Sequence, residues 1–184
     1  NDVRSEYSLE SVKDVRIFRC YRDFFWRLKI DPTKVRPASE ALVRRILQAG
    51  SFPRINVAVD AINLSSVQTG VVIDAFDVAK TKGELSIRVA SQGERFLGIG
   101  MKHEMILGGE EIVISDSLGP IAIYPHRDAS RTAVTSQTRE ILTIVCGVPG
   151  IESKELLAAA SAVSKNVIRF CGGREASRAT MLPK

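Results

Sequence analysis

The sequence predicts an α+β fold, in which amino-terminal helices pack on a largely antiparallel β sheet or sandwich and a carboxy-terminal helix closes the domain. Apolar residues recur at steps of three or four before Gly70, alternate at steps of two beyond it, and return to helical spacing near residue 152. Helical and strand segments therefore come in separate blocks, unlike the alternation typical of a doubly wound parallel sheet. Short connections marked by glycines favour antiparallel pairing of the strands.

Three helices are predicted before the change of period at Gly70. The first covers residues 12–29, where apolar and aromatic residues form a stripe that is more typical of a docking face than of a base-stacking platform. The second starts near Pro37, whose missing N–H is not needed at the first helical position, and ends at Gly50. The third covers residues 56–69. Together they form the amino-terminal block of the domain.

Six strands are predicted beyond Gly70, because the segments are rich in Val and Ile and are separated by glycines. They cover residues 71–76, 85–90, 96–100, 111–116, 120–124 and 139–146. A last helix is expected from about residue 152 to 170, opened by Pro149-Gly150 and ended by Gly172-Gly173. We assign all of residues 1–184 to one domain, with loosely ordered ends at 1–14 and 174–184.

The composition is that of a globular protein, with 45% hydrophobic and 26% charged residues. No apolar run approaches the roughly 20 residues needed to cross a bilayer. The polar amino terminus lacks a signal-peptide core, so we expect a cytoplasmic location without membrane contact. Cys20, Cys146 and Cys171 lie far apart, which predicts buried free thiols rather than disulfides or a zinc ribbon. The sequence leaves the oligomeric state open.

Positive charge is concentrated near the amino terminus. The net charge of the whole chain is +5, whereas residues 16–54 alone hold ten basic residues against three acidic ones. Such a concentration is typical of a surface that binds a polyanion. A solvated helix face is the alternative, and the charges by themselves do not decide between the two.

Metal and cofactor chemistry receives little support from the sequence. The two histidines, His103 and His126, lie in separate turn-like segments, which argues against a His-based metal site or a Ser-His-Asp triad. The glycines of residues 98–100 and 108–109 lack the strand and helix that flank a nucleotide-binding loop. We therefore expect no metal and no cofactor. His126 lies in a polar loop, where it either faces a ligand or only completes the loop.

The polar residues of the third predicted helix and the following strand form the most informative cluster. Asp60 and Asn63 lie three residues apart on the helix and therefore share a face. Gly70 turns the chain, and Asp74 and Asp77 follow on or near the next strand. Either these side chains converge on a pocket at the helix-to-strand corner, or Asp60 and Asn63 only cap or brace neighbouring backbone groups.

The same stretch resembles the B3/B4 tRNA-binding and editing domain of the phenylalanyl-tRNA synthetase β subunit. The matching positions are Arg54-Ile55-Asn56, Val59-Asp60, Asn63, Gly70 and Ala75-Phe76-Asp77. Residues 31–45 and 128–139 look more like the free-standing members of that family. The resemblance extends from about residue 15 to residue 171, and it implies the same arrangement of helices on a largely antiparallel sheet.

The resemblance implies a tRNA-binding protein that acts in trans to hydrolyse a mischarged aminoacyl-tRNA ester and so supports translation fidelity. In that family an ordered water attacks the ester carbonyl without a metal, inside a shaped and partly apolar cleft. The candidate residues are Asn63 and Asp74 for catalysis, Ile62, Gly70, Asp128, Thr138 and Ile144 for substrate binding and, from the charge pattern, Arg36, Arg44 and Arg45 for RNA binding. The expected partner is tRNA or aminoacyl-tRNA, and we do not expect this chain to aminoacylate tRNA on its own.

Several positions depart from the family pattern, among them Val71-Val72 in place of a Gln-Pro pair and three of the candidate site residues. Ile62 stands where the family has a threonine, and Asp74 stands where it has a histidine. Ile144 stands where a glutamate reads the tyrosine hydroxyl, and an apolar side chain cannot accept that hydrogen bond. The amino acid removed is therefore expected to be other than tyrosine. The alternatives are a non-catalytic tRNA-binding module and a small-ligand-binding protein with a vestigial editing pocket.

Overall fold

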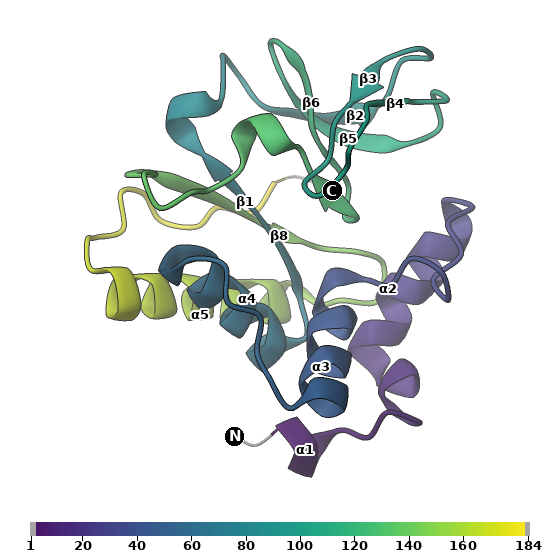
Figure 1. Cartoon of the computed structure of the whole chain (residues 1–184), viewed down its shortest axis with the longest axis vertical. Helices are drawn as coiled ribbons and strands as arrows, with labels where there is room; N and C mark the ends of the chain where they lie inside the picture. Colours follow the sequence, from purple (N-terminus) through teal and green to yellow (C-terminus); the bar gives the residue numbers. More distant parts are fainter. Residues whose placement is uncertain (1–2, 183–184) are drawn as a thin grey trace.

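The helices and most of the strands lie on opposite sides of the molecule in the computed structural model, which describes residues 3–182 (Figure 1). Strands β1 (Val72–Asp77) and β8 (Ile141–Cys146) run between the two sides and link them. The predicted α+β class, with antiparallel strands and a closing carboxy-terminal helix, is confirmed. No helix in the described range has the length and apolar character needed to cross a membrane.

The predicted helices all form, with shifted boundaries. The helices are α1 Val3–Glu6, η1 Val12–Asp14, α2 Arg16–Arg27, α3 Ala38–Ala49, α4 Val57–Thr69, η2 Val78–Lys80, η3 Ser130–Thr132 and α5 Ser153–Cys171, where η marks a 3-10 helix. α2 is shorter than predicted, because Val15 is extended with ψ 128° and Lys29 is left-handed with φ 59°. Pro37 lies at the N-cap of α3 and not at the first helical position, because its ψ of 139° is that of an extended residue.

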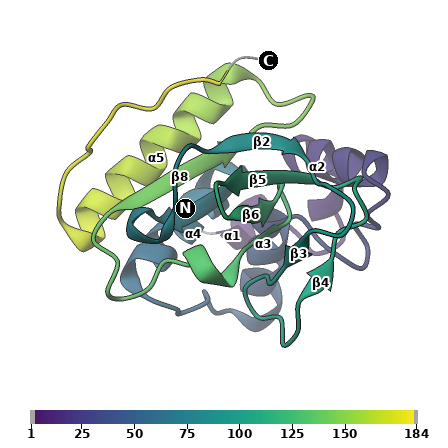
Figure 2. The same cartoon turned by 90° about the horizontal axis from the view of Figure 1, so that it is seen from above.

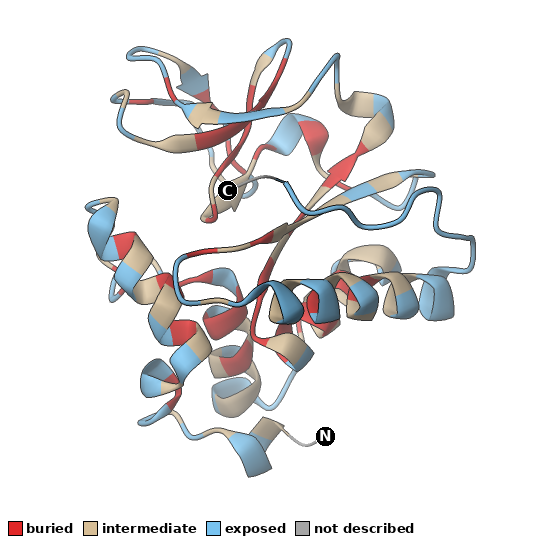
Figure 3. Cartoon of the chain, turned by 180° about the vertical axis from the view of Figure 1, so that it is seen from behind, coloured by how far each residue is buried: buried red, intermediate tan, exposed pale blue. Residues whose placement is uncertain are grey.

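The two ends of the chain differ from each other. From Val3 onward, the segment predicted to be a loosely ordered amino-terminal end contains α1 and η1, and Val12 is fully buried in a cluster with Phe18 and Val43. Val3 and Tyr7 pack against this cluster as well, so the core includes residues that precede the first predicted helix. At the other end, residues 174–182 are exposed and form no helix or strand (Figure 3). The outermost parts of both predicted ends, residues 1–2 and 183–184, lie outside the described range.

The strands pair in antiparallel sheets. β1 pairs with β8, a four-stranded sheet has the order β2–β5–β6–β7, and β3 pairs with β4. The bounds are β2 Ser86–Val89, β3 Arg95–Phe96, β4 Met105–Ile106, β5 Ile112–Asp116, β6 Gly119–Ile123 and β7 Arg127–Asp128. The predicted strand 96–100 shrinks to β3, because the chain turns after Gly98, where Gly100 is left-handed with φ 80°. β4 and β7 are absent from the sequence prediction because two residues are too few to show an alternation. Seen from above, α5 runs beside β8 along one edge of the molecule (Figure 2).

Three aromatic residues of α2 point into the core, which confirms the predicted docking face, whereas Trp26 is 54% exposed. Phe18, Tyr21 and Phe25 are fully buried. The Tyr21 hydroxyl donates to the carbonyl of Cys146 at 2.5 Å and accepts from the N–H of Val72 at 3.0 Å. Since Val72 and Cys146 face each other in the β1–β8 pair, α2 satisfies the backbone at that end of the pair.

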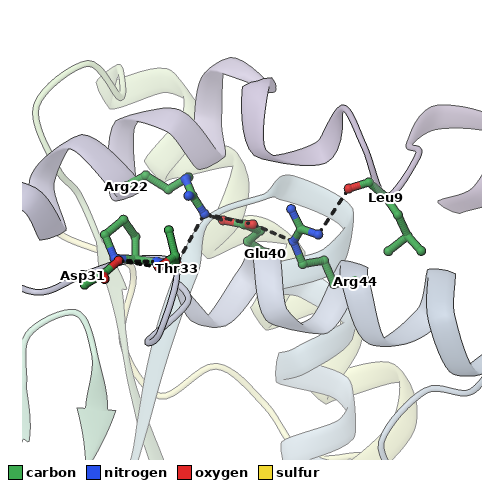
Figure 4. Close-up of polar contacts among 7 residues, drawn as sticks. Leu9, Arg22, Asp31, Thr33, Glu40 and Arg44 are labelled. Atoms are coloured by element: carbon green, nitrogen blue, oxygen red, sulfur yellow. Dashed lines mark hydrogen bonds and ion pairs between the residues drawn. The ribbon is translucent and has the colours of Figure 1, made fainter.

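A buried ion pair joins α2, α3 and two neighbouring segments (Figure 4). The Glu40 side chain on α3 is 0% exposed, and its carboxylate accepts from Arg44 Nε at 2.7 Å and from Arg22 Nη1 at 3.2 Å. The same guanidinium groups donate to the carbonyls of Pro32 at 3.4 Å and Leu9 at 3.2 Å. A carboxylate needs such partners once it leaves water, because its desolvation costs several kcal/mol. The two helices and both segments are therefore held in the arrangement that brings these groups together.

Replacing Glu40 with Gln should lower the free energy of unfolding by about 3–5 kcal/mol, because two largely buried guanidinium groups lose their anion. Urea denaturation followed by circular dichroism measures the change. The control is Glu110→Gln, which removes the exposed pair that Glu110 forms with Lys29 at 2.9 Å and should leave stability unchanged within error. Equal losses in the two variants would contradict the role assigned to the buried pair.

Candidate functional site

Two carboxyl groups and a thiol come together where β1, β7 and β8 meet. Asp74 on β1 is only 6% exposed, and its Oδ2 accepts a hydrogen bond from the Cys146 thiol on β8 at 3.1 Å. Asp128 on β7 accepts through Oδ2 from the N–H of Ala75 at 3.3 Å. The carboxyl groups of Asp74 and Asp128 are hydrogen-bond neighbours. We call these two residues the carboxyl pair.

Burial dominates the electrostatics of the carboxyl pair. It raises the pKa of Asp74 to about 6. It also holds the pKa of Asp128 well above the usual range, and the charge of Asp74 adds to that effect. Burial and the charge of Asp74 likewise raise the pKa of the Cys146 thiol, which stays protonated. With both pKa values raised, the pair holds one proton between its two carboxyl groups near neutral pH.

The unpartnered oxygen of Asp128 fits this assignment. Asp128 Oδ1 is enclosed, and it has no hydrogen-bond partner among residues 3–182 if the group is treated as a carboxylate. A proton on this carboxyl group turns it into a donor toward Asp74. Asp74 is then held between the thiol of Cys146 and the protonated Asp128. The pair shares one proton, because two carboxyl groups at close range do not readily ionise together.

Ile144 lies directly across from Asp74 in the register of β8 against β1. Its half-buried side chain packs against the apolar clusters that contain Cys146 and Phe76. These neighbours keep water from the carboxyl pair and so contribute to the raised pKa values. Of the residues selected from the sequence, the structure brings together Asp74, Asp128 and Ile144.

Two acidic residues of the motif brace the backbone. Asp60 Oδ1 accepts from the N–H of Ile55 at 2.9 Å, just before α4. Asp77 accepts from the N–H of Ala79 at 3.1 Å and from the hydroxyl of Thr138 at 2.7 Å. The bracing interpretation, which concerns Asp60 and Asn63, holds for Asp60. Asp77 also braces the backbone, which the sequence did not predict. The Thr138 hydroxyl is engaged in this contact and is not part of the carboxyl pair.

Asn63 differs from these residues, because its amide has no partner in the part of the chain that the structure describes. It is half-buried on α4, and its side chain makes no hydrogen bond to any residue of the range 3–182. Ile62 beside it is buried. Gly70 ends α4 with φ 73°, and a Cβ at this position would lie 2.6 Å from Ile17 Cγ2. Gly70 therefore serves the backbone and the packing, whereas Asn63 keeps a polar group available to a ligand.

The three arginines selected as RNA-binding candidates line one cleft of about 380 Å³. We call it the basic cleft and define it by Lys34, Arg36, Arg44, Arg45, His126 and Arg127. Arg44 lies in its wall but is also bound to Glu40. Burial and the neighbouring Arg127 lower the pKa of His126, so its ring is neutral at neutral pH. His126 packs edge-on against Phe25, with 6.1 Å between the ring centroids.

The sequence missed the chemical role of Cys146. It is buried as predicted, but its thiol is a hydrogen-bond donor to Asp74. This contact depends on the register of β8 against β1, which no local pattern reports. Cys20 is half-buried and Cys171 is exposed at the end of α5, so the prediction of three buried thiols is wrong for Cys171. Within residues 3–182, no group of three or more His, Cys, Asp or Glu side chains is arranged to hold a metal ion.

Comparisons with known sequences point to one family. The family model described as "B3/4 domain" matches residues 20–176. The phenylalanine–tRNA ligase β subunit of Nocardia farcinica is 34% identical over 113 residues, which cover 61% of this chain and 13% of that protein. The same subunit of Lactobacillus acidophilus is 31% identical over 120 residues, which cover 64% of this chain and 15% of that protein. The chain therefore corresponds to a small part of the length of these relatives.

A solved structure shows a similar fold. It is an N-terminal fragment of the phenylalanyl-tRNA synthetase β subunit from Pyrococcus horikoshii, with a TM-score of 0.52. The two sequences are 20% identical, and the match covers 61% of this chain and 40% of the other. The likeness supports the arrangement of helices and strands.

The carboxyl pair should make the protein less stable as the pH rises from about 4 to 8. The folded state binds the Asp74 proton more tightly than the unfolded chain does. The stabilisation is therefore complete below the unfolded pKa of 3.8 and is lost as the pH rises through about 6. This group alone should account for about 3 kcal/mol.

The variant Asp128→Asn tests the predicted pH dependence of stability. Its amide can donate to Asp74 and accept from the N–H of Ala75, but it cannot share a titratable proton with Asp74. Its free energy of unfolding, measured by urea denaturation at several pH values, should fall less than that of the wild type between pH 4 and 8. Asp23→Asn, which changes an exposed carboxyl group of α2, should keep the wild-type profile. A wild-type profile in Asp128→Asn would contradict the shared proton.

Proposed function

This chain belongs to the B3/4 domain family, and from that premise we propose that it binds tRNA and hydrolyses the ester bond of a mischarged aminoacyl-tRNA. Water adds to the ester carbonyl, the bond to the terminal ribose oxygen breaks, and the free amino acid and the tRNA hydroxyl are released. The similar subunits are named as phenylalanine–tRNA ligases, which supports tRNA as the partner. Because the chain matches only 13% and 15% of those subunits, aminoacylation is not part of the proposal.

The available amide of Asn63 is the observation that carries the proposal. Motif residues hold its helix at both ends: the Asn56 side chain accepts from the N–H of Val59 at 3.0 Å, and Gly70 forms the left-handed cap. These contacts place Asn63 without using its own hydrogen-bonding groups. An amide both donates and accepts, so it can orient an ester carbonyl together with a ribose hydroxyl or the attacking water.

Asp74 is the acid–base group of the proposed reaction. With a pKa of about 6 it is ionised at neutral pH, and a group with a pKa near the working pH both takes up and releases a proton readily. Cys146 and Asp128 hold its carboxylate from two sides. The apolar Ile144 opposite Asp74 cannot accept a hydrogen bond from a substrate hydroxyl. The proposed substrate therefore carries an amino acid other than tyrosine.

A second candidate function is tRNA binding without catalysis, and the enclosure of the carboxyl pair favours it. Asp74 is 6% exposed, and the groups that bind its carboxylate belong to the protein itself. If the protein only binds tRNA, the shared proton and the Cys146 thiol stabilise the packing of the strands, and the editing pocket is vestigial. A protein that binds a free small ligand instead of tRNA is the third outcome that the experiment below separates.

A deacylation screen of the purified protein against a panel of mischarged tRNAs tests the proposal. On the tRNA that is cleaved, Asn63→Ala should slow single-turnover hydrolysis by about tenfold or more and leave tRNA binding unchanged, because it removes a positioning group. The control is Gln68→Ala, which removes an exposed amide from the same helix and should keep the wild-type rate.

The outcomes separate the three candidates. Hydrolysis of at least one mischarged tRNA supports the proposal. Failure on every tRNA with binding intact would end the hydrolase proposal and favour the binding module. If no tRNA binds even at low salt, both tRNA functions fail and a small ligand is favoured, because phosphate contacts strengthen as salt is lowered.

A further inference from the structure

We propose that the basic cleft binds successive phosphate groups of an RNA strand, with Arg36, Arg45 and Arg127 as the contacting cations. This inference rests on the proposed tRNA binding and assigns it to one surface. It narrows the broad positive charge of residues 16–54 to a few side chains around one cavity.

The charge of the cleft is not neutralised within the protein. Lys34 and four arginines line it, and none of the residues that line it is acidic. The guanidinium groups of Arg36 and Arg45 have no hydrogen-bond or ion-pair partner in the range 3–182. Several other basic residues of the same lobe do have acidic partners, as Arg16 has with Glu155 and Lys29 with Glu110. Arg36 and Arg45 therefore remain available to an external anion.

The fold builds this cleft from parts that are distant in sequence. Ala41, Arg45 and Gln48 line it from one face of α3, because they recur at helical spacing. The opposite face of α3 is buried and contains Glu40, which locks the helix to α2. Arg127 enters from β7 on the other side. The cations are thus placed before any ligand arrives, which lowers the cost of ordering them on binding.

The lining selects for a hydrophilic, multiply charged ligand. The apolar side chains in it are small, Val35 and the alanines at 41 and 49, so the cleft offers little to a lipid chain or an apolar peptide. Arginine forks match phosphate oxygens in pairs. The α3 residues from Ala41 to Gln48 extend for about 10 Å. Cations spread over that length suit a chain of phosphates better than a single phosphate, and grooves of this kind follow the backbone of single-stranded nucleic acids.

The cleft and the carboxyl pair share the strand β7. Arg127 lines the cleft, and Asp128, the next residue of β7, belongs to the pair. Successive side chains of a strand point to opposite faces. An RNA strand held at Arg127 is therefore anchored on the same two-residue strand that carries Asp128. The phosphate contacts and the proposed chemistry thus use different side chains of one short strand.

Binding of uncharged tRNA and of a single-stranded RNA oligonucleotide, measured at several salt concentrations, tests the assignment. The double variant Arg36→Ala/Arg45→Ala should bind at least about tenfold more weakly at low salt, and its slope of log K against log salt should fall by about 1.5 to 2. Arg44 is left unchanged, because it also holds Glu40. The control is Arg19→Ala/Arg139→Ala, which removes the same charge from exposed positions outside the cleft and should cost much less affinity.

Each result bears on the cleft separately from the proposed hydrolysis. Loss of binding in the cleft variant alone supports the cleft, whether or not the wild type cleaves any aminoacyl ester. Equal losses in the cleft and control variants would show a diffuse charge effect and overturn the assignment. Tight binding of pyrophosphate by a wild type that binds no RNA would also overturn it. If the wild type binds RNA but hydrolyses no aminoacyl ester, only the proposed reaction fails, and the cleft is still judged by the binding of its variants.

Discussion

The buried carboxylate of Glu40 is the constraint on which the helical half of the molecule depends. Two guanidinium groups surround it, and each of them also reaches a backbone carbonyl of another segment. Since an unpaired carboxylate could not stay out of water, α2, α3 and the segments at Leu9 and Pro32 are held in one arrangement. α3 is thereby oriented with one face in the core and another along the basic cleft. The ion pair determines which of its cations remain available, because it engages Arg44, whereas Arg45 has no partner among the described residues 3–182.

α2 connects this constraint to the strands through two adjacent residues. Arg22 binds Glu40, while Tyr21 bridges the backbone of Val72 and Cys146 at one end of the β1–β8 pair. The Tyr21 hydroxyl therefore helps to set the strand register that places the Cys146 thiol beside Asp74. A single helix thus supports both the basic cleft and the carboxyl pair. The two features share a scaffold even though they lie on different elements.

The carboxyl pair costs more desolvation free energy than a purely structural role requires. Ionised Asp74 is almost completely buried, and apolar side chains of similar volume would fill the same space without the cost of removing a charge from water. Titratable groups with raised pKa values of this kind gather at functional sites. Burial raises the pKa of Asp74 and also limits access to it, while the hydrogen bond from the Cys146 thiol acts in the opposite direction on that pKa. Burial thus gives Asp74 a pKa suited to catalysis and at the same time limits the access of a substrate to it. The deacylation screen distinguishes a catalytic from a structural role.

The sequence by itself determined the class of the fold, the helices, the longer strands and the family, because these depend on local periods and on motif residues such as Asn56 and Gly70. Helical and strand periods act over a few neighbouring residues, and caps act within one turn. The tertiary structure alone decided the two-residue strands β4 and β7, the thiol contact of Cys146 with Asp74, and the separation of engaged from available arginines. Each of these depends on groups far apart in the chain that meet only after folding: Asp74 and Asp128 are brought together by β1 and β7, and Arg127 reaches the basic cleft from the strand side. Burial and pairing, which set the charge and the pKa of such groups, are properties of the packed molecule, and no local pattern contains them.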